Sequence, residues 1–224
     1  RGLGDVYKRQ DYDGSLQRRG LTPPQYLEKL GLTAYPVLAA HCVWMTDEDI
    51  ELFARRGATV LHNPMSNLKL ASGVLPLAAA RKHGVRVALG TDSVASNNNL
   101  NMMEELRMFL LVQKGFSGDA TLLTPAEAMA CATRVGALAQ GRDDCGWIVP
   151  GARADLCVLD VSAPAMQPVH DLLNNVAYSA SGSDIVLTMC DGRVLYRDGQ
   201  YPTMDIARVV YETEVSRKRI TGAL

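Results

Sequence analysis

The sequence predicts an α/β protein in which a parallel sheet is followed by a smaller β region. Three short apolar runs alternate with stretches of helical periodicity, and strands buried on both faces of a parallel sheet have this continuous apolar character. Each run ends in a polar or ionisable residue. The last third of the 224-residue chain changes to short strands and turn signals. Consecutive β-α units imply a parallel sheet, so we expect two regions of different architecture.

The three apolar runs are the predicted parallel strands. They cover residues 36–40, 59–61 and 85–89, and they are followed by His41, by His62 and Asn63, and by Gly90, Thr91 and Asp92. Barrel enzymes and open α/β sheets both place their chemistry at this carboxyl end of the strands. Three units cannot close an eight-stranded barrel, which needs about 250 residues. The sheet is therefore open or incomplete.

Helix signals lie between and after the strands. Thr46 with Asp49, and Thr124 with Glu127, follow the capping-box pattern. A polar loop is expected over residues 65–72, before a helix that Gly84 ends. In the next helix one broad apolar stripe is predicted, formed by Met102, Met103, Leu106, Phe109 and Leu110, with Glu104, Glu105 and Arg107 off it.

The last third is predicted to be a small β region closed by a helix. Residues 146–148 and 155–160 are expected to be short strands, and residues 184–190 and 193–196 a hairpin around the turn Asp191-Gly192. Residues 205–218 have the mixed charge of an exposed helix.

Composition limits the class of protein. Hydrophobic residues make up 47% of the chain and charged residues 21%, as in ordinary globular proteins. The net charge of −1 gives no indication of nucleic acid or of an acidic membrane surface. No apolar run approaches the roughly 20 residues of a membrane-spanning helix. The five scattered cysteines favour small buried thiols in a reduced, cytoplasmic protein over a disulfide framework.

The start of the chain differs from the remainder. Residues 1–10 read RGLGDVYKRQ, begin with Arg1 and show neither helical nor strand periodicity. They resemble a translated adaptor sequence and are set aside from the fold. The alternative is a genuine polar N-terminal arm.

His41 and Asp92 are the candidate catalytic residues. Each follows a predicted parallel strand, and in a barrel both side chains would point toward the central mouth. Such a pair can supply a carboxylate metal ligand and an imidazole that holds or protonates a reacting oxygen. By itself the pair is weak, because a histidine at a strand end is commonly structural and an aspartate there is often a helix cap.

Longer motifs occur around this pair in one order along the chain. They are His41-Cys42-Val43, the stretch from His62 to Leu70 (HNPMSNLKL), Gly90-Thr91-Asp92 followed by Ala95-Ser96-Asn97-Asn98, Ala132-Thr133 with Gly136-Ala137, and Gly151-Ala152-Arg153-Ala154-Asp155-Leu156. From about Leu21 to the final helix, the chain resembles the methylthioadenosine / S-adenosylhomocysteine deaminase branch of the amidohydrolase superfamily. That branch includes chlorohydrolase-like and guanine-deaminase-like members. Ser93-Val94 stand where many relatives have Gly-Ala.

The resemblance implies a distorted (β/α)8 barrel, of which this chain supplies strands six to eight, beside a small β-sandwich. Residues 11–144 would form the partial barrel, 145–204 part of the sandwich and 205–224 the C-terminal helix. His41 matches the family histidine that contacts the metal-bound hydroxide and the attacked centre. Asp92 matches the aspartate that is a metal ligand and takes the proton of the water. The implied metal is Zn²⁺ or another divalent transition ion. Because relatives often form oligomers, a homo-oligomer is one expectation for the intact protein.

Other family ligands have no match in the sequence. The family has a His-x-His pair on strand one, a histidine on strand five and a glutamate three residues after it, and the four histidines here form neither pattern. This difference predicts a C-terminal portion of the enzyme that is inactive alone. The leading hypothesis for the intact enzyme is hydrolytic deamination of an adenosine-type purine nucleoside. Guanine deamination, chlorotriazine hydrolysis and a non-catalytic fragment or binding module remain alternatives.

The remaining polar residues have simpler interpretations. His62 either lines the pocket floor or, as the favoured interpretation, makes a structural hydrogen bond. His83 is expected at the surface beside a helix end, and His170 in a structural loop. Residues 97–99 are three asparagines expected to shape the turn after the last parallel strand. The acidic pairs Glu104-Glu105 and Asp143-Asp144 are expected to be solvated.

Overall fold

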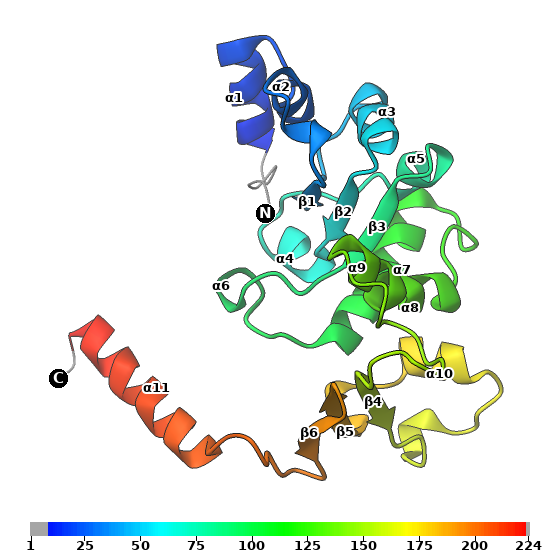
Figure 1. Cartoon of the computed structure of the whole chain (residues 1–224), viewed down its shortest axis with the longest axis vertical. Helices are drawn as coiled ribbons and strands as arrows, with labels where there is room; N and C mark the ends of the chain where they lie inside the picture. The colour runs from blue at the N-terminus through cyan, green and yellow to red at the C-terminus, as the bar shows by residue number, and fades with distance from the viewer. Residues whose placement is uncertain (1–8, 223–224) are drawn as a thin grey trace.

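Three parallel strands form the central sheet of the computed structural model, which describes residues 9–222 (Figure 1). The strands are β1 (Leu38–Ala40), β2 (Thr59–His62) and β3 (Arg86–Leu89), in the spatial order β1-β2-β3. Ala40 pairs with Leu61 and Leu61 with Ala88, so these residues lie in one row across the sheet. The three strands predicted from the apolar runs, and their parallel order, are confirmed.

Helices precede, separate and follow the strands. The α-helices are α1 (Arg9–Arg19), α2 (Pro23–Lys29), α3 (Asp47–Arg56), α4 (Pro64–Lys69), α5 (Leu77–Lys82), α6 (Val94–Asn97), α7 (Met102–Ser117), α8 (Pro125–Ala132), α9 (Arg134–Ala139), α10 (Leu172–Tyr178) and α11 (Ile206–Thr221), with short 3-10 turns η1 (Leu32–Ala34), η2 (Pro164–Met166) and η3 (Gly182–Asp184). The expectation for residues 1–10 lies mostly outside the described residues. Arg9 and Gln10 form the start of α1.

One face of the parallel sheet packs against helices and forms the core. Ala39, Val60 and Val87 are at most 7% exposed and share one cluster with Phe53 of α3 and Phe109 of α7. The opposite face carries the row of Ala40, Leu61 and Ala88. Helices α3 and α7 therefore pack on the side of the sheet that carries Ala39, Val60 and Val87.

Capping residues set where several helices begin. The side chain of Thr46 accepts from Asp49 N, and Thr124 accepts from Glu127 N, so both predicted capping boxes are confirmed. Gly57 ends α3 in the left-handed conformation, with φ of 64°. The expected loop over residues 65–72 is wrong in part, because α4 occupies its first half. Pro64 at the first helical position has the φ that a helix requires.

The last third contains a second, antiparallel sheet. It consists of β4 (Leu156–Leu159), β5 (Ile185–Cys190) and β6 (Arg193–Arg197), in the order β4-β5-β6. The predicted hairpin is confirmed, and its turn residues Asp191 and Gly192 both have positive φ, at 48° and 77°. In the described part of the chain these strands form one sheet. The partial sandwich and the domain boundaries at residues 144 and 204 remain predictions.

The strand predicted over residues 146–148 is wrong, because this segment is irregular. Gly146 has φ of 83°, and a Cβ there would lie 2.9 Å from Ala137 Cβ. Trp147 lies under the guanidinium of Arg134, at 4.0 Å from the ring centroid. Close approach to α9 therefore sets the path of this segment, and no local periodicity indicates it.

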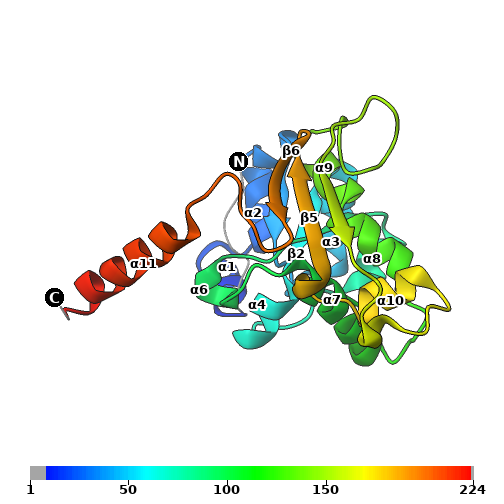
Figure 2. The same ribbon diagram turned by 90° about the horizontal axis from the view of Figure 1, so that it is seen from below.

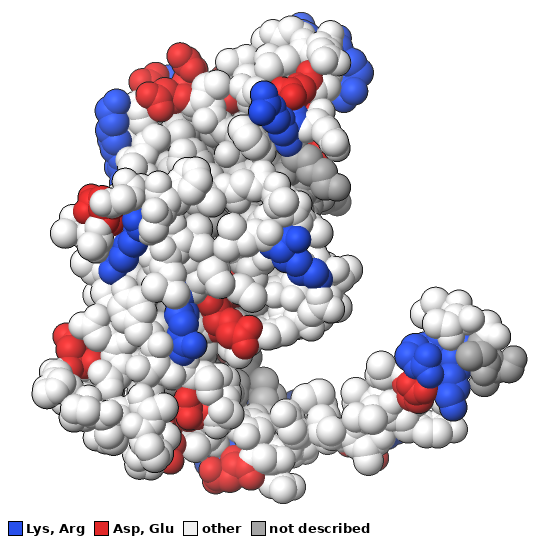
Figure 3. Space-filling model, turned by 180° about the vertical axis from the view of Figure 1, so that it is seen from behind, with Lys and Arg blue, Asp and Glu red and all other residues white. Residues whose placement is uncertain are grey.

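Helix α11 extends away from the remainder of the molecule (Figures 1 and 2). None of its residues is buried, and the space-filling view shows it as an arm separated from the body by open space (Figure 3). On that face basic and acidic side chains are interspersed, in accord with the net charge of −1. Among residues 9–222, no helix is both long enough and apolar enough to cross a membrane.

The cysteines only partly follow their prediction. All five are free thiols, as expected. Cys42 and Cys145 are buried, whereas Cys157 and Cys190, on β4 and β5, are exposed. The expectation of buried thiols throughout is therefore wrong, because the antiparallel sheet leaves both cysteines accessible to solvent.

Candidate active site

Three residues with unusual backbone conformations mark the carboxyl edge of the parallel sheet. His41 and Cys42 follow β1 with φ of 68° and 51°, and Asp92 follows β3 with φ of 59°. Residues other than glycine uncommonly adopt this left-handed region, although asparagine, aspartate and histidine do so several-fold more often than the others. Such strain costs about 1–3 kcal/mol per residue and is concentrated at functional sites. Both sequence-predicted site residues thus lie at strained strand ends.

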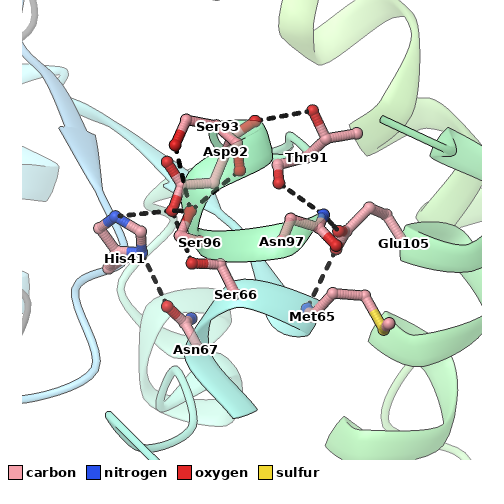
Figure 4. Close-up of polar contacts among 10 residues, drawn as sticks. All are labelled: His41, Met65, Ser66, Asn67, Thr91, Asp92, Ser93, Ser96, Asn97 and Glu105. Carbon is pink, nitrogen blue, oxygen red and sulfur yellow. Dashed lines mark hydrogen bonds and ion pairs between the residues drawn. The ribbon is translucent and has the colours of Figure 1, made fainter. Parts of the chain in front are cut away.

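The structure brings these two residues together (Figure 4). His41 Nε2 lies 3.9 Å from Asp92 Oδ2, and the side chain of His41 is 1% exposed against 18% for Asp92. His41 Nδ1 is 2.7 Å from Oδ1 of Asn67, which is itself 1% exposed. An amide oxygen can only accept a hydrogen bond, so Nδ1 carries the proton. In the neutral ring, Nε2 then presents its lone pair toward Asp92.

Two hydroxyl groups hold the carboxylate of Asp92. Ser66 Oγ of α4 and Ser96 Oγ of α6 each donate to Asp92 Oδ2 at 2.6 Å. Hydrogen bonds to a charged acceptor are shorter and stronger than those between neutral groups. Ser66, Ser96 and Asn67 belong to motifs that carried the family resemblance, but no role was predicted for them. Spacing alone could not show that their side chains converge on His41 and Asp92.

Glu105 was predicted to be solvated, and this is wrong. It is 0% exposed, its Oε2 accepts from the backbone N–H of Met65 at 3.2 Å, and its Oε1 accepts from Asn97 Nδ2 at 2.5 Å. Burial raises the pKa of Glu105 to about 7, against the smaller lowering by these two hydrogen bonds. Glu104, the preceding residue in the sequence, is half-buried and accepts hydrogen bonds from Asn99 and Asn101 in the preceding loop.

The asparagines after β3 do shape the turn there. Asn98 has φ of 73° and ends α6, as the prediction of unusual backbone angles requires. Asn97 also has a role that the prediction did not include. Its Nδ2 donates both to the carbonyl of Thr91 at 2.6 Å and to Glu105. The amide therefore ties the segment around Asp92 to α7.

The favoured interpretation of His62 as a hydrogen-bonded structural residue is wrong within the described residues. Neither ring nitrogen has a hydrogen-bond partner there, although His62 is 1% exposed. The ring instead packs edge-on against Phe109, with centroids 5.0 Å apart. Burial, together with a smaller electrostatic effect of nearby His41, lowers the pKa of His62 to about 3. His62 is therefore a neutral packing residue beneath the site.

The other polar candidates lie away from His41 and Asp92. His83 ends α5 and is only partly exposed, at 3.8 Å from Glu51 Oε1. His170 is exposed in its loop. Asp144, expected to be solvated, forms an ion pair with Arg153 at 2.5 Å, whereas Asp143 is exposed.

A cavity lies between helix α9 and the face of the sheet that carries Ala40, Leu61 and Ala88, next to Asp92. Its volume is about 330 Å³, and it is lined by Leu38, Ala40, Leu61, Asn63, Ala88, Leu89, Gly90, Asp92, Gly136, Ala139 and Gln140. The strand side chains give it apolar walls, and Asp92 lies at the carboxyl end. A mainly apolar pocket with a few convergent polar groups is the usual form of a small-molecule site.

The donor set at this edge fits one part of a metal site. A carboxylate and an imidazole are both ligands of Zn²⁺, and Asp92 is aimed and restrained as a ligand would be. A structural or catalytic zinc needs at least three protein ligands. In the region covered by the structure, no group of three or more His, Cys, Asp or Glu side chains could hold a metal ion. Among the described residues, His41 and Asp92 could therefore supply only part of such a site.

A histidine–aspartate pair thus lies at the carboxyl ends of parallel strands, beside an apolar pocket, where α/β enzymes usually place their chemistry. Comparison with known proteins identifies the family. Residues 16–195 match the model of the amidohydrolase family, so the chain belongs to this family. Its sequence lies in the methylthioadenosine / S-adenosylhomocysteine deaminase branch, which confirms the resemblance predicted from its motifs.

Its relatives carry related names. The chain is 44% identical over 195 residues to 5-methylthioadenosine/S-adenosylhomocysteine deaminase of Dictyoglomus thermophilum, covering 87% of this chain and 46% of that protein. It is 42% identical over 203 residues to 5'-deoxyadenosine deaminase of Methanothermobacter thermautotrophicus, covering 91% and 47%. The chain thus spans about half the length of these relatives.

Solved structures agree with this assignment. An adenosine deaminase from Xanthomonas campestris with bound zinc superimposes with a TM-score of 0.95 at 36% identity, over 99% of this chain and 51% of that one. The zinc complex of atrazine chlorohydrolase from Arthrobacter aurescens gives 0.87 at 27% identity, over 93% and 47%. The α/β fold of an amidohydrolase is therefore confirmed.

Proposed function

We propose that the protein is a metal-dependent hydrolytic deaminase of adenosine-type purines. In this reaction water replaces the amino group at C6 of the purine ring and ammonia leaves. The observation that carries the proposal is the His41–Asp92 pair at the strand ends of a chain 44% identical to a named deaminase. The free thiols are compatible with a cytoplasmic protein.

Asp92 and His41 would have different roles in the reaction. Asp92 would be a metal ligand and the acceptor of the proton from the attacking water, since its carboxylate is restrained by Ser66 and Ser96. When bound, Zn²⁺ or another divalent transition ion lowers the pKa of water toward neutrality. His41 directs Nε2 to the same place, where it can hold the attacking oxygen, and Asn67 keeps its ring oriented. This arrangement is general base catalysis by a positioned carboxylate.

The apolar lining of the pocket beside Asp92 is suited to a planar, apolar part of a substrate, such as a purine ring. Leu38, Leu61 and Ala88 line the cavity together with the small residues Ala40 and Gly90, which lie next to its polar edge. An aromatic ring can lie against such walls while its reacting carbon reaches His41 and Asp92. We therefore assign the cavity of about 330 Å³ to part of the purine site.

We further propose that the catalytic unit includes a segment beyond these 224 residues. The chain spans about half of its relatives, and among the described side chains no three could hold a metal together. The remaining ligands would come from that segment, so the 224-residue chain alone is expected to be inactive. Stoichiometric zinc binding with measurable turnover by this chain alone would contradict the proposal. DNA upstream that encodes His-x-His and a later His-x-x-Glu would support it.

The substrate proposal is tested by ammonia release. The full-length, zinc-loaded protein is given methylthioadenosine, S-adenosylhomocysteine, 5'-deoxyadenosine and adenosine in parallel. Turnover of at least one is expected. Turnover of none, in protein that binds zinc, would reject the assignment to adenosine-type substrates.

The structural similarity to atrazine chlorohydrolase supports a second candidate, which keeps the site and changes the leaving group. A chlorotriazine and guanine are therefore included in the same assay. Chloride release from the triazine, or ammonia from guanine, without turnover of adenosine-type purines would favour this candidate.

A further inference from the structure

One buried carboxylate joins the two short helices that hold the candidate catalytic pair. Glu105 lies in the first turn of α7 and is 0% exposed. Its two oxygens have different partners: Met65 N of α4 at 3.2 Å, and Asn97 Nδ2 of α6 at 2.5 Å (Figure 4). Burying a carboxylate is costly unless its oxygens are hydrogen-bonded. Such a group needs an explanation beyond core packing.

The first link replaces a missing helix cap. Asn63, which precedes α4, makes no capping hydrogen bond with its side chain, and Pro64 has no N–H. Met65 therefore has the first free N–H of α4, and the carboxylate of Glu105 accepts it from 40 residues away. A negative charge at the start of a helix is also favourable. Ser66 and Asn67 follow directly, and their side chains hold Asp92 and His41.

The second link fixes the other side of the site. Asn97 is the last residue of α6. Its side chain donates both to Glu105 and to the carbonyl of Thr91, the residue directly before Asp92. Its neighbour Ser96 donates to Asp92 Oδ2. Glu105 is thus connected to both hydroxyl groups that hold Asp92. Met65 connects it to the adjacent Ser66, and Asn97 connects it to the adjacent Ser96.

Neither helix can hold its place alone. Helix α4 has six residues and α6 has four, far fewer than the about 12–15 that an isolated helix needs in water. Their positions must come from tertiary contacts. Helix α7, with 16 residues and a buried apolar face, is a rigid support by comparison.

We propose that Glu105 is a positioning residue for the metal and proton-transfer site: it sets the spacing of Ser66 and Ser96, and through them the orientation of Asp92. This inference rests on the proposed function for its catalytic consequence, but its geometric part concerns only contacts within this chain. Glu105 touches neither substrate nor metal. Groups that orient a metal ligand commonly change metal affinity or activity by about 10- to 100-fold when replaced.

The test compares E105Q with E104Q in the full-length protein. Glutamine keeps the length of the side chain but turns one oxygen into an N–H donor, which then faces the donor of either Met65 or Asn97. E104Q makes the same chemical change on the adjacent residue, whose partners are Asn99 and Asn101. Zinc affinity without substrate, kcat and KM, and a crystal structure of each variant are measured.

For E105Q we expect zinc affinity and kcat to fall by about 10- to 100-fold, with KM little changed and at least one of the two Ser Oγ–Asp92 Oδ2 distances lengthened from 2.6 Å. E104Q should match the unaltered protein. Equal zinc affinity in both variants, with both serine contacts intact in E105Q, would overturn the proposal. Because zinc affinity and the two distances need no substrate, they test Glu105 even if no purine is turned over.

Should E105Q not fold, N97A tests the same idea by removing one of the two links and leaving the cap of α4. We expect a lengthened Ser96–Asp92 distance, an intact Ser66–Asp92 contact and a smaller loss of zinc affinity. Unchanged distances and unchanged zinc affinity in N97A would contradict the role of Glu105.

Discussion

Replacing Asn67 by leucine removes the amide oxygen that holds the ring of His41. The two side chains are each 1% exposed, and the Nδ1–Oδ1 distance is 2.7 Å. Water cannot readily replace the lost acceptor at such depth. An unsatisfied buried N–H costs about 1–3 kcal/mol, and this value is the upper limit for the decrease in the free energy of unfolding of N67L. The loss is measured by chemical denaturation.

The same change should alter the protonation of the ring. His41 can escape the unsatisfied N–H by moving its proton to Nε2, which then points a donor toward Asp92 Oδ2, 3.9 Å away. That ring can no longer accept at Nε2, and misplacement of a catalytic group by about 1 Å costs on the order of 100-fold in rate. We therefore expect N67L to lose about 100-fold or more in kcat/KM for ammonia release.

The control is N67D, which keeps an oxygen at the same place and should keep the proton on Nδ1. Nitrogen-15 NMR of the histidine ring distinguishes the two tautomers directly. Activity of N67L close to that of the unaltered protein, with the proton still on Nδ1, would refute the assignment of Asn67 as the residue that orients His41.

Three further predictions concern Asp92, Glu105 and a helix cap. S66A and S96A should each weaken the hold on Asp92 by about 1.5–3 kcal/mol, and the double variant, measured by zinc affinity, should lose more than either; unchanged affinity in the double variant would contradict the contacts. Because burial raises the pKa of Glu105 from 4.5 to about 7, its folded-state contribution is fully present below pH about 4.5 and is lost as pH rises through 7. The free energy of unfolding of the unaltered protein should thus decline by about 3 kcal/mol over this range relative to that of E105Q. If the unfolding free energies of the two proteins change with pH in parallel, the raised pKa of Glu105 is contradicted. T46A, which breaks the capping box of α3, should lower the free energy of unfolding by about 1 kcal/mol, and a change under about 0.3 kcal/mol would contradict the cap.

Local patterns were sufficient to predict much of the fold. Apolar runs located the three parallel strands, because a strand buried on both faces needs a continuous apolar sequence. Thr46 and Thr124 marked helix starts, because a cap depends on residues only three positions apart. Helix α2 has the same signal, with Thr22 and Gln25 around Pro23, although no helix is predicted there from the sequence.

Contacts between distant segments could not be predicted in this way. Glu105 lies beside Glu104 in the sequence and off the apolar stripe of α7, so periodicity assigned both to solvent. Its burial depends on Met65, 40 residues earlier, and on Asn97. The sequence likewise named His41 and Asp92, but their approach to 3.9 Å follows from the register of β1, β2 and β3.

The role proposed for His41 and Asp92 is to act together in the active site of an adenosine-type deaminase. Its most direct test is the rate of ammonia release from methylthioadenosine by the full-length, zinc-loaded protein, compared with its D92N variant. We expect turnover by the former, and the loss of both bound zinc and turnover in D92N. Turnover by D92N at the unaltered rate would contradict it.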